Sequence, residues 1–356
     1  MKYKKIVVKI GTSVIAKAGG GLDRDAIIGI ARQVSFLLDK NIKVILVSSG
    51  AIGAGLDILN SRTIPSSLSG LQATASIGQS ELMHIYSEAF KKRNYFVGQI
   101  LLTQDDFDHR RRYLNIKYTM EALLGKRAVP IVNENDTVAT EEIKCGDNDR
   151  LSSLVADLSE ADLLIILTDV DGLYDKEGKV VSTVEGITGQ IRGLVGKKCL
   201  PFTKGGMATK IEAAERVTRA GIDCLVANGR RENIILELVK GAGTGTHFKA
   251  LAVKAKAKKR WIAYSSKVKG SILVDDGAKT ILINKHKSLL SSGIIGKDGN
   301  FKAGDVISIM GSEKKEFARG LTNYSSKEIE RIKGLKTGAI EAALGYKDHD
   351  EVVHRD

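Results

Sequence analysis

The sequence predicts an α/β fold, in which a mainly parallel sheet is covered by helices and is followed by a smaller, mostly β domain. Up to about residue 246, short apolar runs alternate with segments of helical periodicity, which is typical of repeated β-α-β units. Beyond Arg260 the pattern changes to short strands separated by Gly, Asp and Asn turns. With 356 residues the chain is also too long for one typical core, so two domains are expected.

The first β-α-β unit is expected at the start of the chain. The β-branched run of residues 6–10 predicts a strand that ends in a tight, small-residue turn. Asp23 is a suitable N-cap, and apolar residues recur at helical spacing from there to Lys40. The continuous apolar run 44–47 predicts a strand buried on both faces, and it leads into a glycine-rich turn over residues 48–55.

The same alternation continues through the rest of the larger domain. A hairpin-like segment is expected around residues 176–179, where charged residues and a glycine interrupt the pattern. We expect helices near residues 70–93 and 111–124, one that begins near Leu151 and one that ends at Ala220, and strands at residues 97–102, 128–132, 163–167 and 224–227.

A change in composition marks the boundary between the domains. Glycines gather at residues 241–246 and lysines at residues 254–260, which is typical of a linker. The predicted domains are therefore 1–253 and 269–356, joined by a basic linker at 254–268. Within the second domain we expect strands at residues 271–276, 279–284, 305–311 and 316–321, and a weak helix near residues 326–335.

The bulk properties exclude several classes of protein. No apolar run approaches the ~18–20 residues that a membrane helix needs, and the basic start has too short an apolar run for a signal peptide. Three widely spaced cysteines argue against a disulfide scaffold or a structural zinc site and suit a reducing cytoplasm, which is the expected location. The formal net charge of +13 predicts anionic partners such as nucleotides, phosphorylated metabolites or nucleic acid.

The stretch from Asn133 to Ser153 is the first candidate for a reaction site. It crowds Asn, Asp and Glu after a predicted strand, and open α/β sheets bind ligands at the carboxyl ends of their strands. A solvated surface loop is the alternative interpretation. Three aspartates, Asp136, Asp147 and Asp149, would suggest a metal site, but their spacing is not that of an EF-hand and no histidine lies nearby.

Two lysines could bring positive charge to this stretch. Lys9 ends the first strand beside Gly11, where an ammonium can approach a phosphate closely. In the segment 205–210, GGMATK, two glycines and a threonine lead into a helix whose first turn carries Lys210, so that amides, hydroxyl and ammonium could converge on a triphosphate. The glycines of residues 50–55 form a third, weaker candidate for binding an anion, although they could equally serve only to turn the chain.

The six histidines do not form a promising constellation, and this favours one kind of substrate. A carboxylate with a pKa of ~4 is already ionised at neutral pH, so it needs no general base to become a nucleophile. Phosphorylation of a carboxylate needs only positioning, cations and magnesium.

Nine short segments occur in an order that is similar to one known family. The segments are VVKIGTS, VSSGAIGAG, SIGQ, QILLT, RRYLN, VNENDTV, GDNDRLS, LTDVDGLY and GGMATK. They resemble the amino-acid kinase family, and within it the enzymes that phosphorylate glutamate; the tail is similar to a PUA domain. The resemblance covers essentially the whole chain and implies an αβα sandwich up to about residue 250, followed by a β-rich PUA-like domain.

The resemblance also implies an activity and a set of site residues. It implies transfer of the ATP γ-phosphate to the side-chain carboxylate of L-glutamate, the first step of proline biosynthesis, with Mg²⁺ accompanying the nucleotide. The implied catalytic residues are Lys9, Asp149 and Lys210, with Asp149 orienting the two lysines. Glutamate would be bound by Ser49, Asp136 and Asn148. The nucleotide would be bound by Lys9, Thr168, Asp169, Lys204, Gly205, Gly206, Met207, Ala208, Thr209 and Lys210.

Several further expectations follow from the resemblance. Proline is the implied feedback inhibitor, and a homodimer or homotetramer is the implied assembly. The sequence departs from the family pattern at Lys204, where a small hydroxyl residue or glycine is usual, and at Cys145, where an aromatic residue is usual. Kinases of the same fold that act on acetylglutamate, aspartate or uridylate are an alternative, as is an RNA-binding module that uses the basic tail. The tail lacks a dense interleaving of aromatic and basic residues, which favours a structural or regulatory role.

Overall fold

The chain folds into two compact units, Met1–Ala255 and Lys256–Asp356, and each is considered by itself. The computed structural model describes residues 2–17, 21–139, 147–194, 206–251, 262, 268–285 and 287–354. None of the helices in these ranges is long and apolar enough to cross a membrane.

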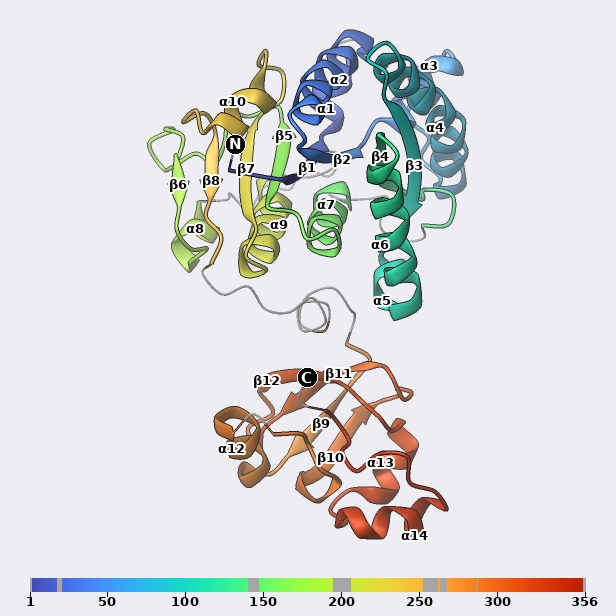
Figure 1. Ribbon diagram of the computed structural model, residues 1–356, viewed down its shortest axis with the longest axis vertical. Coiled ribbons are helices and arrows are strands. Elements are labelled where there is room, and N and C mark those ends of the chain that lie inside the picture. Colours follow the sequence, from blue (N-terminus) through green and yellow to red (C-terminus); the bar gives the residue numbers. More distant parts are fainter. Residues whose placement is uncertain are drawn as a thin grey trace. The chain divides into compact units, whose positions relative to one another are not determined.

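The described part of the first unit contains an eight-stranded sheet in the order β3-β4-β2-β1-β5-β7-β8-β6 (Figure 1). The six strands from β3 to β7 run parallel, β8 is antiparallel to β7, and β6 is parallel to β8. The strands are β1 (Lys5–Ile10), β2 (Lys43–Ser48), β3 (Phe96–Leu102), β4 (Ala128–Glu134), β5 (Leu163–Thr168), β6 (Thr183–Val184), β7 (Asp223–Asn228) and β8 (Thr246–Phe248). The predicted mainly parallel sheet is therefore confirmed.

Helices cover both faces of this sheet, with α2 and α10 on one side and α7 and α9 on the other (Figure 1). The described helices are α1 (Thr12–Ile15), α2 (Arg24–Asp39), α3 (Ala51–Ile58), α4 (Leu68–Lys91), α5 (Gln104–Asp108), α6 (Arg110–Gly125), α7 (Asp147–Leu158), α8 (Gly189–Gly193), α9 (Met207–Arg219) and α10 (Ile234–Lys240). The Asp23 carboxylate accepts a hydrogen bond from Ala26 N at 3.0 Å, so the predicted N-cap of α2 is confirmed.

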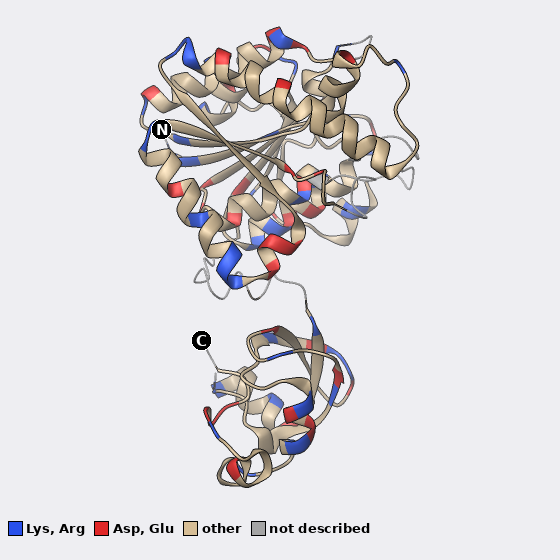
Figure 2. Cartoon of the chain, turned by 90° about the vertical axis from the view of Figure 1, so that its right-hand side faces the viewer, with Lys and Arg blue, Asp and Glu red and all other residues tan. Residues whose placement is uncertain are grey.

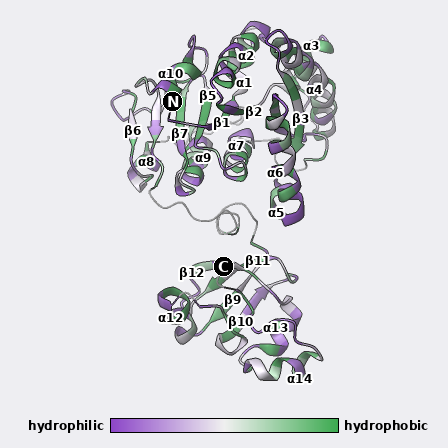
Figure 3. Cartoon of the chain, viewed as in Figure 1, coloured by the Kyte–Doolittle hydropathy of each residue, from purple (hydrophilic) through white to green (hydrophobic). Residues whose placement is uncertain are grey.

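The alternation of side chains along β1 decides which residue reaches the reaction side of the sheet. Val8 and Ile10 belong to the core packed against α2 and α10, and the strands are predominantly hydrophobic (Figure 3). Because neighbouring side chains of a strand point to opposite faces, Lys9 projects to the face covered by α7 and α9. The register pairs Ile10 with Ser48 and with Leu167, so the carboxyl ends of β1, β2 and β5 lie at one edge of the sheet.

Two expectations about local structure in this unit are wrong. The glycine-rich segment 50–55 is a turn only at Gly50, whose φ is 108°, and from Ala51 the chain is helical in α3. Gly55 packs so closely on α4 that a Cβ at this position would lie 1.9 Å from Thr74 O, so tertiary packing outweighs the weak helix propensity of glycine. Helix α7 begins at Asp147, earlier than the predicted start near Leu151, because Asp and Asn are favourable in a first helical turn.

The second unit contains a four-stranded sheet in the order β10-β9-β11-β12 among the residues described. Its strands are β9 (Gly270–Val274), β10 (Ile294–Gly299), β11 (Val306–Met310) and β12 (Glu316–Leu321). Its helices are α12 (Asp276–Lys285), α13 (Ser326–Ile332) and α14 (Ile340–Leu344), with short 3-10 turns at Ser291–Gly293 and Thr337–Ala339. A small β-rich domain is therefore confirmed, as is its helix near residue 326.

The predicted strand at residues 279–284 is wrong, because this segment belongs to α12. Its alternating apolar residues Ile281 and Ile283 are about half exposed, so they do not form the buried face that the alternation suggested. The side chain of Asp275 accepts a hydrogen bond from Ala278 N at 2.6 Å, which is an N-terminal capping contact that favours a helix. Conversely, β10 was not predicted, since two glycines and an aspartate interrupt its apolar pattern.

Candidate active site

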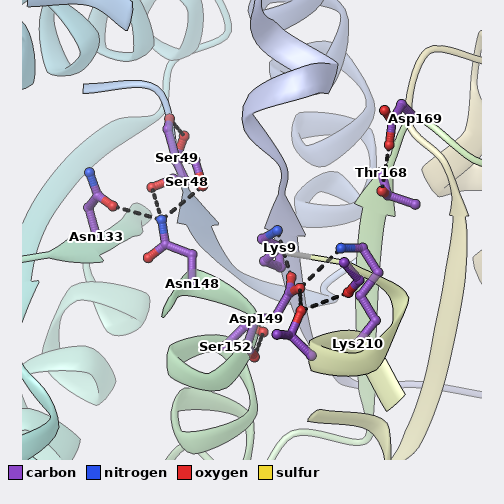
Figure 4. A network of polar contacts seen from close by, with 12 residues as sticks. Lys9, Ser48, Ser49, Asn133, Asn148, Asp149, Ser152, Thr168, Asp169 and Lys210 are labelled. Carbon is purple, nitrogen blue, oxygen red and sulfur yellow. Dashed lines mark hydrogen bonds and ion pairs between the residues drawn. The ribbon is translucent and has the colours of Figure 1, made fainter. Parts of the chain in front are cut away.

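Two lysines from distant parts of the chain meet at one carboxylate (Figure 4). The Nζ of Lys9, on β1, lies 2.6 Å from Asp149 Oδ1, and the Nζ of Lys210, on α9, lies 3.1 Å from Asp149 Oδ2. All three residues are buried, with exposed fractions of 6%, 1% and 4% for Lys9, Asp149 and Lys210. The hydroxyl of Thr209 is 2.7 Å from the same Oδ2. One buried carboxylate therefore holds two cations at the carboxyl edge of the sheet.

Burial and the neighbouring charges shift the pKa values of Asp149 and Lys210. Burial by itself raises the pKa of Asp149, but the two neighbouring ammonium groups and the Thr209 hydroxyl outweigh burial and hold the pKa below its ordinary value. Burial lowers the pKa of Lys210, with Lys9 adding to the effect, and the attraction of Asp149 only partly opposes it. Two ammonium groups facing one carboxylate leave a net positive charge, so the cluster favours a further anion.

A second polar cluster, composed of amides and hydroxyls, lies beside the charged one (Figure 4). Asn148 Nδ2 approaches Ser49 Oγ at 2.8 Å, Ser48 O at 3.3 Å and Asn133 Oδ1 at 3.0 Å. The Ser48 hydroxyl in turn lies 2.8 Å from the hydroxyl of Tyr86, a residue that is completely buried. The cluster thus joins the ends of β2 and β4 to the first turn of α7.

The first turn of α7 explains why the two clusters are neighbours and yet distinct. Asn148 and Asp149 are consecutive residues of a helix, so their side chains leave the axis about 100° apart. Asn148 faces the ends of β2 and β4, and Asp149 faces β1 and α9. The two side chains therefore point to different partners, whereas the expected functions of the two directions remain a prediction.

The residues expected to bind a nucleotide lie around the start of α9 and the end of β5. Thr168 and Asp169 end β5, and the Thr168 hydroxyl donates to Asp169 Oδ1 at 3.0 Å. The carboxylate of Asp169 is close enough to Lys210 to oppose, in part, the lowering of the Lys210 pKa by burial. Helix α9 starts after Gly206 and has no acidic residue of its own in its first turn, which favours an anion at this end. Lys204 and Gly205 lie outside the described residues, as does Cys145.

Asp136 lies beside a hollow and not in the amide cluster. The hollow has a volume of about 230 Å³ and is formed by α4, β3, the last residue of β4 and the residues that follow it. Its wall contains Gln79, Gln99, Glu134, Asn135 and Asp136, together with Ala75, Ser76, Ser80, Leu101 and Thr137. Two carboxylates and several amides in a hollow of this size suit a small polar molecule with an ammonium group.

Two residues that the sequence analysis did not select belong to this region. Asn133 links the cluster to α4, because its Nδ2 donates to Gln79 Oε1 at 2.9 Å. Both residues stood inside segments, VNENDTV and SIGQ, that had been noted for the resemblance, but nothing in their spacing indicated a contact between them. Among the described residues there is no group of three or more His, Cys, Asp or Glu side chains that could hold a metal ion.

The chain belongs to the amino acid kinase family. The model of that family matches residues 4–228, and the model of the PUA domain matches residues 270–344. These matches assign the sheet with the lysine cluster to the kinase part and the four-stranded sheet to the PUA part, in agreement with the expected fold.

Several curated relatives that match this chain along its full length are named glutamate 5-kinase. The protein of that name from Thermoanaerobacter sp. (strain X514) is 44% identical over 358 residues, covering 99% of this chain and 96% of the relative. Those from Caldanaerobacter subterraneus subsp. tengcongensis and Geobacter sulfurreducens are 45% and 44% identical, and the alignments cover 99% and 100% of this chain. Both domains, and not the kinase part alone, are therefore shared with these enzymes.

Proposed function

We propose that this protein is an ATP-dependent kinase that phosphorylates the side-chain carboxylate of L-glutamate and produces L-glutamyl 5-phosphate, the first step of proline biosynthesis. The observation that carries the proposal is the turn of α7 that joins a lysine–carboxylate–lysine cluster to a cluster of amides. Full-length similarity to enzymes named glutamate 5-kinase supports the choice of substrate.

The two lysines supply the charge that phosphoryl transfer requires. In the transition state negative charge is spread over the oxygens of the transferred group, so catalysis depends on positioned cations. Lys9 and Lys210 are held at the sheet edge by Asp149, and their burial strengthens their interaction with an anion. We assign both lysines to the transferred phosphoryl group and Asp149 to their orientation.

No residue needs to act as a general base. The side-chain carboxylate of glutamate has a pKa of about 4.3 and is ionised at neutral pH, so it is a nucleophile without losing a proton. Positioning of the carboxylate beside the phosphoryl group is then the main task of the chain. Ser49 and Asn148 are suited to this task, because Asn148 is next to Asp149 in the first turn of α7 and its Nδ2 lies 2.8 Å from Ser49 Oγ.

The opposite end of the substrate is assigned to the hollow that contains Asp136. An α-ammonium group is attracted by the carboxylates of Glu134 and Asp136, and the volume of about 230 Å³ lies below the roughly 300–1,000 Å³ of pockets for larger ligands. The hollow therefore favours an amino acid over a nucleotide. With this assignment the enzyme would distinguish an amino acid from carboxylic acids that lack an ammonium group.

The nucleotide is assigned to the start of α9 and the end of β5. The positive end of the α9 dipole, together with Lys210, favours phosphate groups, and Thr168 and Asp169 offer polar contacts beside them. Mg²⁺ would be carried on the ATP phosphates, where it neutralises negative charge, since the described residues contain no cluster of metal ligands. Asp149 is already engaged by two lysines, so it serves their orientation and not a metal.

The regulation, assembly and location of the enzyme are further parts of this proposal. On the basis of the family we expect proline to inhibit, the chain to form a homodimer or homotetramer, and the enzyme to work in the cytoplasm. For the PUA domain we favour a structural or regulatory role over RNA binding. Basic and acidic residues alternate along its helices, strands and loops (Figure 2), and four of its cations form ion pairs, Lys279–Glu313, Arg319–Glu316, Lys333–Glu330 and Lys347–Asp350.

Hydroxamate formation tests the proposed reaction directly. Purified protein, ATP, Mg²⁺ and hydroxylamine are incubated with glutamate, aspartate, N-acetylglutamate or UMP, and acyl hydroxamate and ADP are both measured. The expected result is hydroxamate with glutamate alone. ADP formation with UMP, or hydroxamate with one of the other acids in place of glutamate, would reject the proposed substrate and favour another kinase of the same fold.

A further inference from the structure

Gln79, on α4, occupies the end of a chain of amides that connects the hollow to the turn of α7. Its Oε1 accepts a hydrogen bond from Asn133 Nδ2 at 2.9 Å, and Asn133 Oδ1 accepts one from Asn148 Nδ2 at 3.0 Å. Asn148 Nδ2 also lies 2.8 Å from Ser49 Oγ. Gln79 thus touches the wall of the hollow on one side and, through Asn133, reaches the residue next to Asp149 on the other.

Backbone groups fix the directions of the Asn133 and Asn148 amides. The backbone N–H of Glu134 donates to Asn133 Oδ1 at 2.9 Å, and a backbone N–H can only donate. Asn133 must therefore present its oxygen to Glu134 N and Asn148 Nδ2, and its amide nitrogen to Gln79. At the other end, the carbonyl of Ser48 can only accept, which turns the nitrogen of Asn148 toward the cluster.

Gln79 supplies the acceptor that completes this arrangement. Asn133 is only 3% exposed, so its amide nitrogen has no access to bulk water and depends on a partner from the protein. Without the oxygen of Gln79, the Asn133 amide would hold a buried, unsatisfied donor and would no longer have a single favourable orientation. Asn148 would then lose a fixed partner, and the cluster would have to be ordered when the substrate binds.

We propose that Gln79 is a positioning residue for the amino-acid substrate, acting through Asn133 on Asn148. The inference rests on the proposed function, because it assigns the amide cluster to the binding of glutamate. It adds that a residue of α4, outside the lysine cluster and outside the first turn of α7, determines how well that cluster is organised before the substrate arrives. We therefore expect Gln79 to influence the binding of the amino acid and not the binding of ATP.

The test combines single variants with a double-mutant cycle in the full-length enzyme. Gln79→Met keeps the length of the side chain and removes the acceptor, and we expect the KM for glutamate to rise roughly tenfold, the value for one lost hydrogen bond. The KM for ATP is expected to stay within about twofold and kcat within about threefold, since the lysine cluster is not changed. In an Asn133→Ala background Gln79→Met should add less than about twofold, because its route of action is already absent.

Gln72→Met is the matched control. Gln72 lies two turns earlier on α4, donates to Ala139 O at 3.1 Å and does not contribute to the wall of the hollow, so its replacement should leave the KM for glutamate within about twofold. Thermal unfolding of each variant reports whether it is folded.

Three results would overturn the inference. These are an unchanged KM for glutamate in Gln79→Met, an equal rise in the KM values for glutamate and ATP, and full additivity with Asn133→Ala. If the double variant does not fold, the comparison of the two KM values in Gln79→Met decides alone. A wild-type enzyme that fails to phosphorylate glutamate would instead reject the proposed function, which the hydroxamate assay detects separately.

Discussion

Lys9 and Asp149 are far apart in the sequence, yet the Nζ of Lys9 lies 2.6 Å from Asp149 Oδ1 and both side chains are almost completely buried. The same carboxylate pairs with Lys210 at 3.1 Å. Buried ion pairs are not strongly stabilising in themselves, but the removal of one partner leaves uncompensated charge. The relationship therefore makes Asp149 important both for the fold of the site and for the placement of its cations.

Replacement of this carboxylate should affect stability and catalysis together. Asp149→Asn leaves two buried ammonium groups without a counter-charge, and we expect it to lower the free energy of unfolding by about 3–5 kcal/mol and kcat by at least tenfold. Denaturant unfolding and steady-state kinetics measure the two effects. Asp25→Asn, at an exposed position in the first turn of α2, is the control and should change the free energy of unfolding and kcat only slightly. A fully active, equally stable Asp149→Asn protein would contradict the orienting role.

Removal of one cation should mainly lower turnover. Lys210→Ala eliminates an ammonium that we assign to the transferred phosphoryl group, and loss of one such electrostatic contact lowers kcat by roughly a hundredfold or more. Initial rates with saturating glutamate and ATP provide the measurement. Lys240→Ala, at the exposed end of α10, is the control and is expected to keep the wild-type kcat. An unchanged kcat in Lys210→Ala would reject its assigned role.

The lowered pKa of Lys210 predicts an alkaline loss of activity. Because burial places the pKa below the ordinary 10.5, the catalytic ammonium loses its proton at a lower pH than an exposed lysine does. Stability changes in the opposite direction to activity, because the unfolded chain binds this proton more tightly than the folded protein does. The contribution of Lys210 to the free energy of unfolding therefore increases as pH rises from its lowered pKa in the folded protein to the ordinary value of 10.5. A fall in kcat that begins below pH 10.5 would then occur without unfolding.

Lys210→Arg separates this titration from other alkaline effects. A guanidinium stays charged over the pH range in which Lys210 loses its proton. The kcat of the variant should therefore be lower than that of the wild type but should change less with pH in the alkaline range. Circular dichroism at each pH reports whether the protein remains folded. An alkaline limb that is the same in the wild type and in Lys210→Arg would show that another group titrates.

The sequence predicted the parts of the site that depend on strand and helix ends. Lys9 ends a clear strand, and Lys210 lies in the first turn after two glycines, so the order of β-α-β units was enough to bring them to the same edge of the sheet. The polar stretch at that edge indicated Asp136, Asp147 and Asp149 alike, and only the resemblance implied that Asp149 orients the two lysines. The two lysines are identified by their place in regular elements, which hydrophobic periodicity reports well.

The sequence did not predict the parts that depend on packing between side chains. The hydrogen bond between Gln79 and Asn133 joins a helix to a strand, and neither residue carries a local pattern that indicates its partner. Helix α3 was missed because its glycines are poor helix formers, although they allow α4 to approach. The alternating isoleucines of residues 279–284 suggested a strand, whereas the structure forms α12 and leaves them half exposed.

Asp136 provides a test of the hollow as the site of the amino-acid end. Asp136→Ala removes a carboxylate from its wall, and we expect the apparent KM for glutamate to rise roughly tenfold or more while the KM for ATP changes little. Asp175→Ala, in the loop between Tyr174 and Val180, is the control because its side chain bonds only to neighbouring backbone amides in that loop. A rise in the KM for ATP alone would place Asp136 on the nucleotide side.

The contact between α3 and α4 should tolerate no added side chain. A Cβ at Gly78 would lie 1.9 Å from Ala51 O and 2.2 Å from Gly55 N, so the two helices would have to separate near the residues that follow Ser49. We expect Gly78→Ala to lower the free energy of unfolding by about 2–3 kcal/mol and to raise the KM for glutamate, because only Gly50 separates Ser49 from the start of α3.

Gly53→Ala is the matched substitution on the other partner of this contact. Gly53 also lies within α3, but among the residues that the structure describes no atom outside its own helix lies within 4 Å of an added Cβ, so alanine should stabilise the helix by about 0.5–1 kcal/mol. Denaturant unfolding of both variants measures the difference in sign. Equal stability of the two variants would show that α3 and α4 can move apart freely, and that their close approach does not determine the position of Ser49.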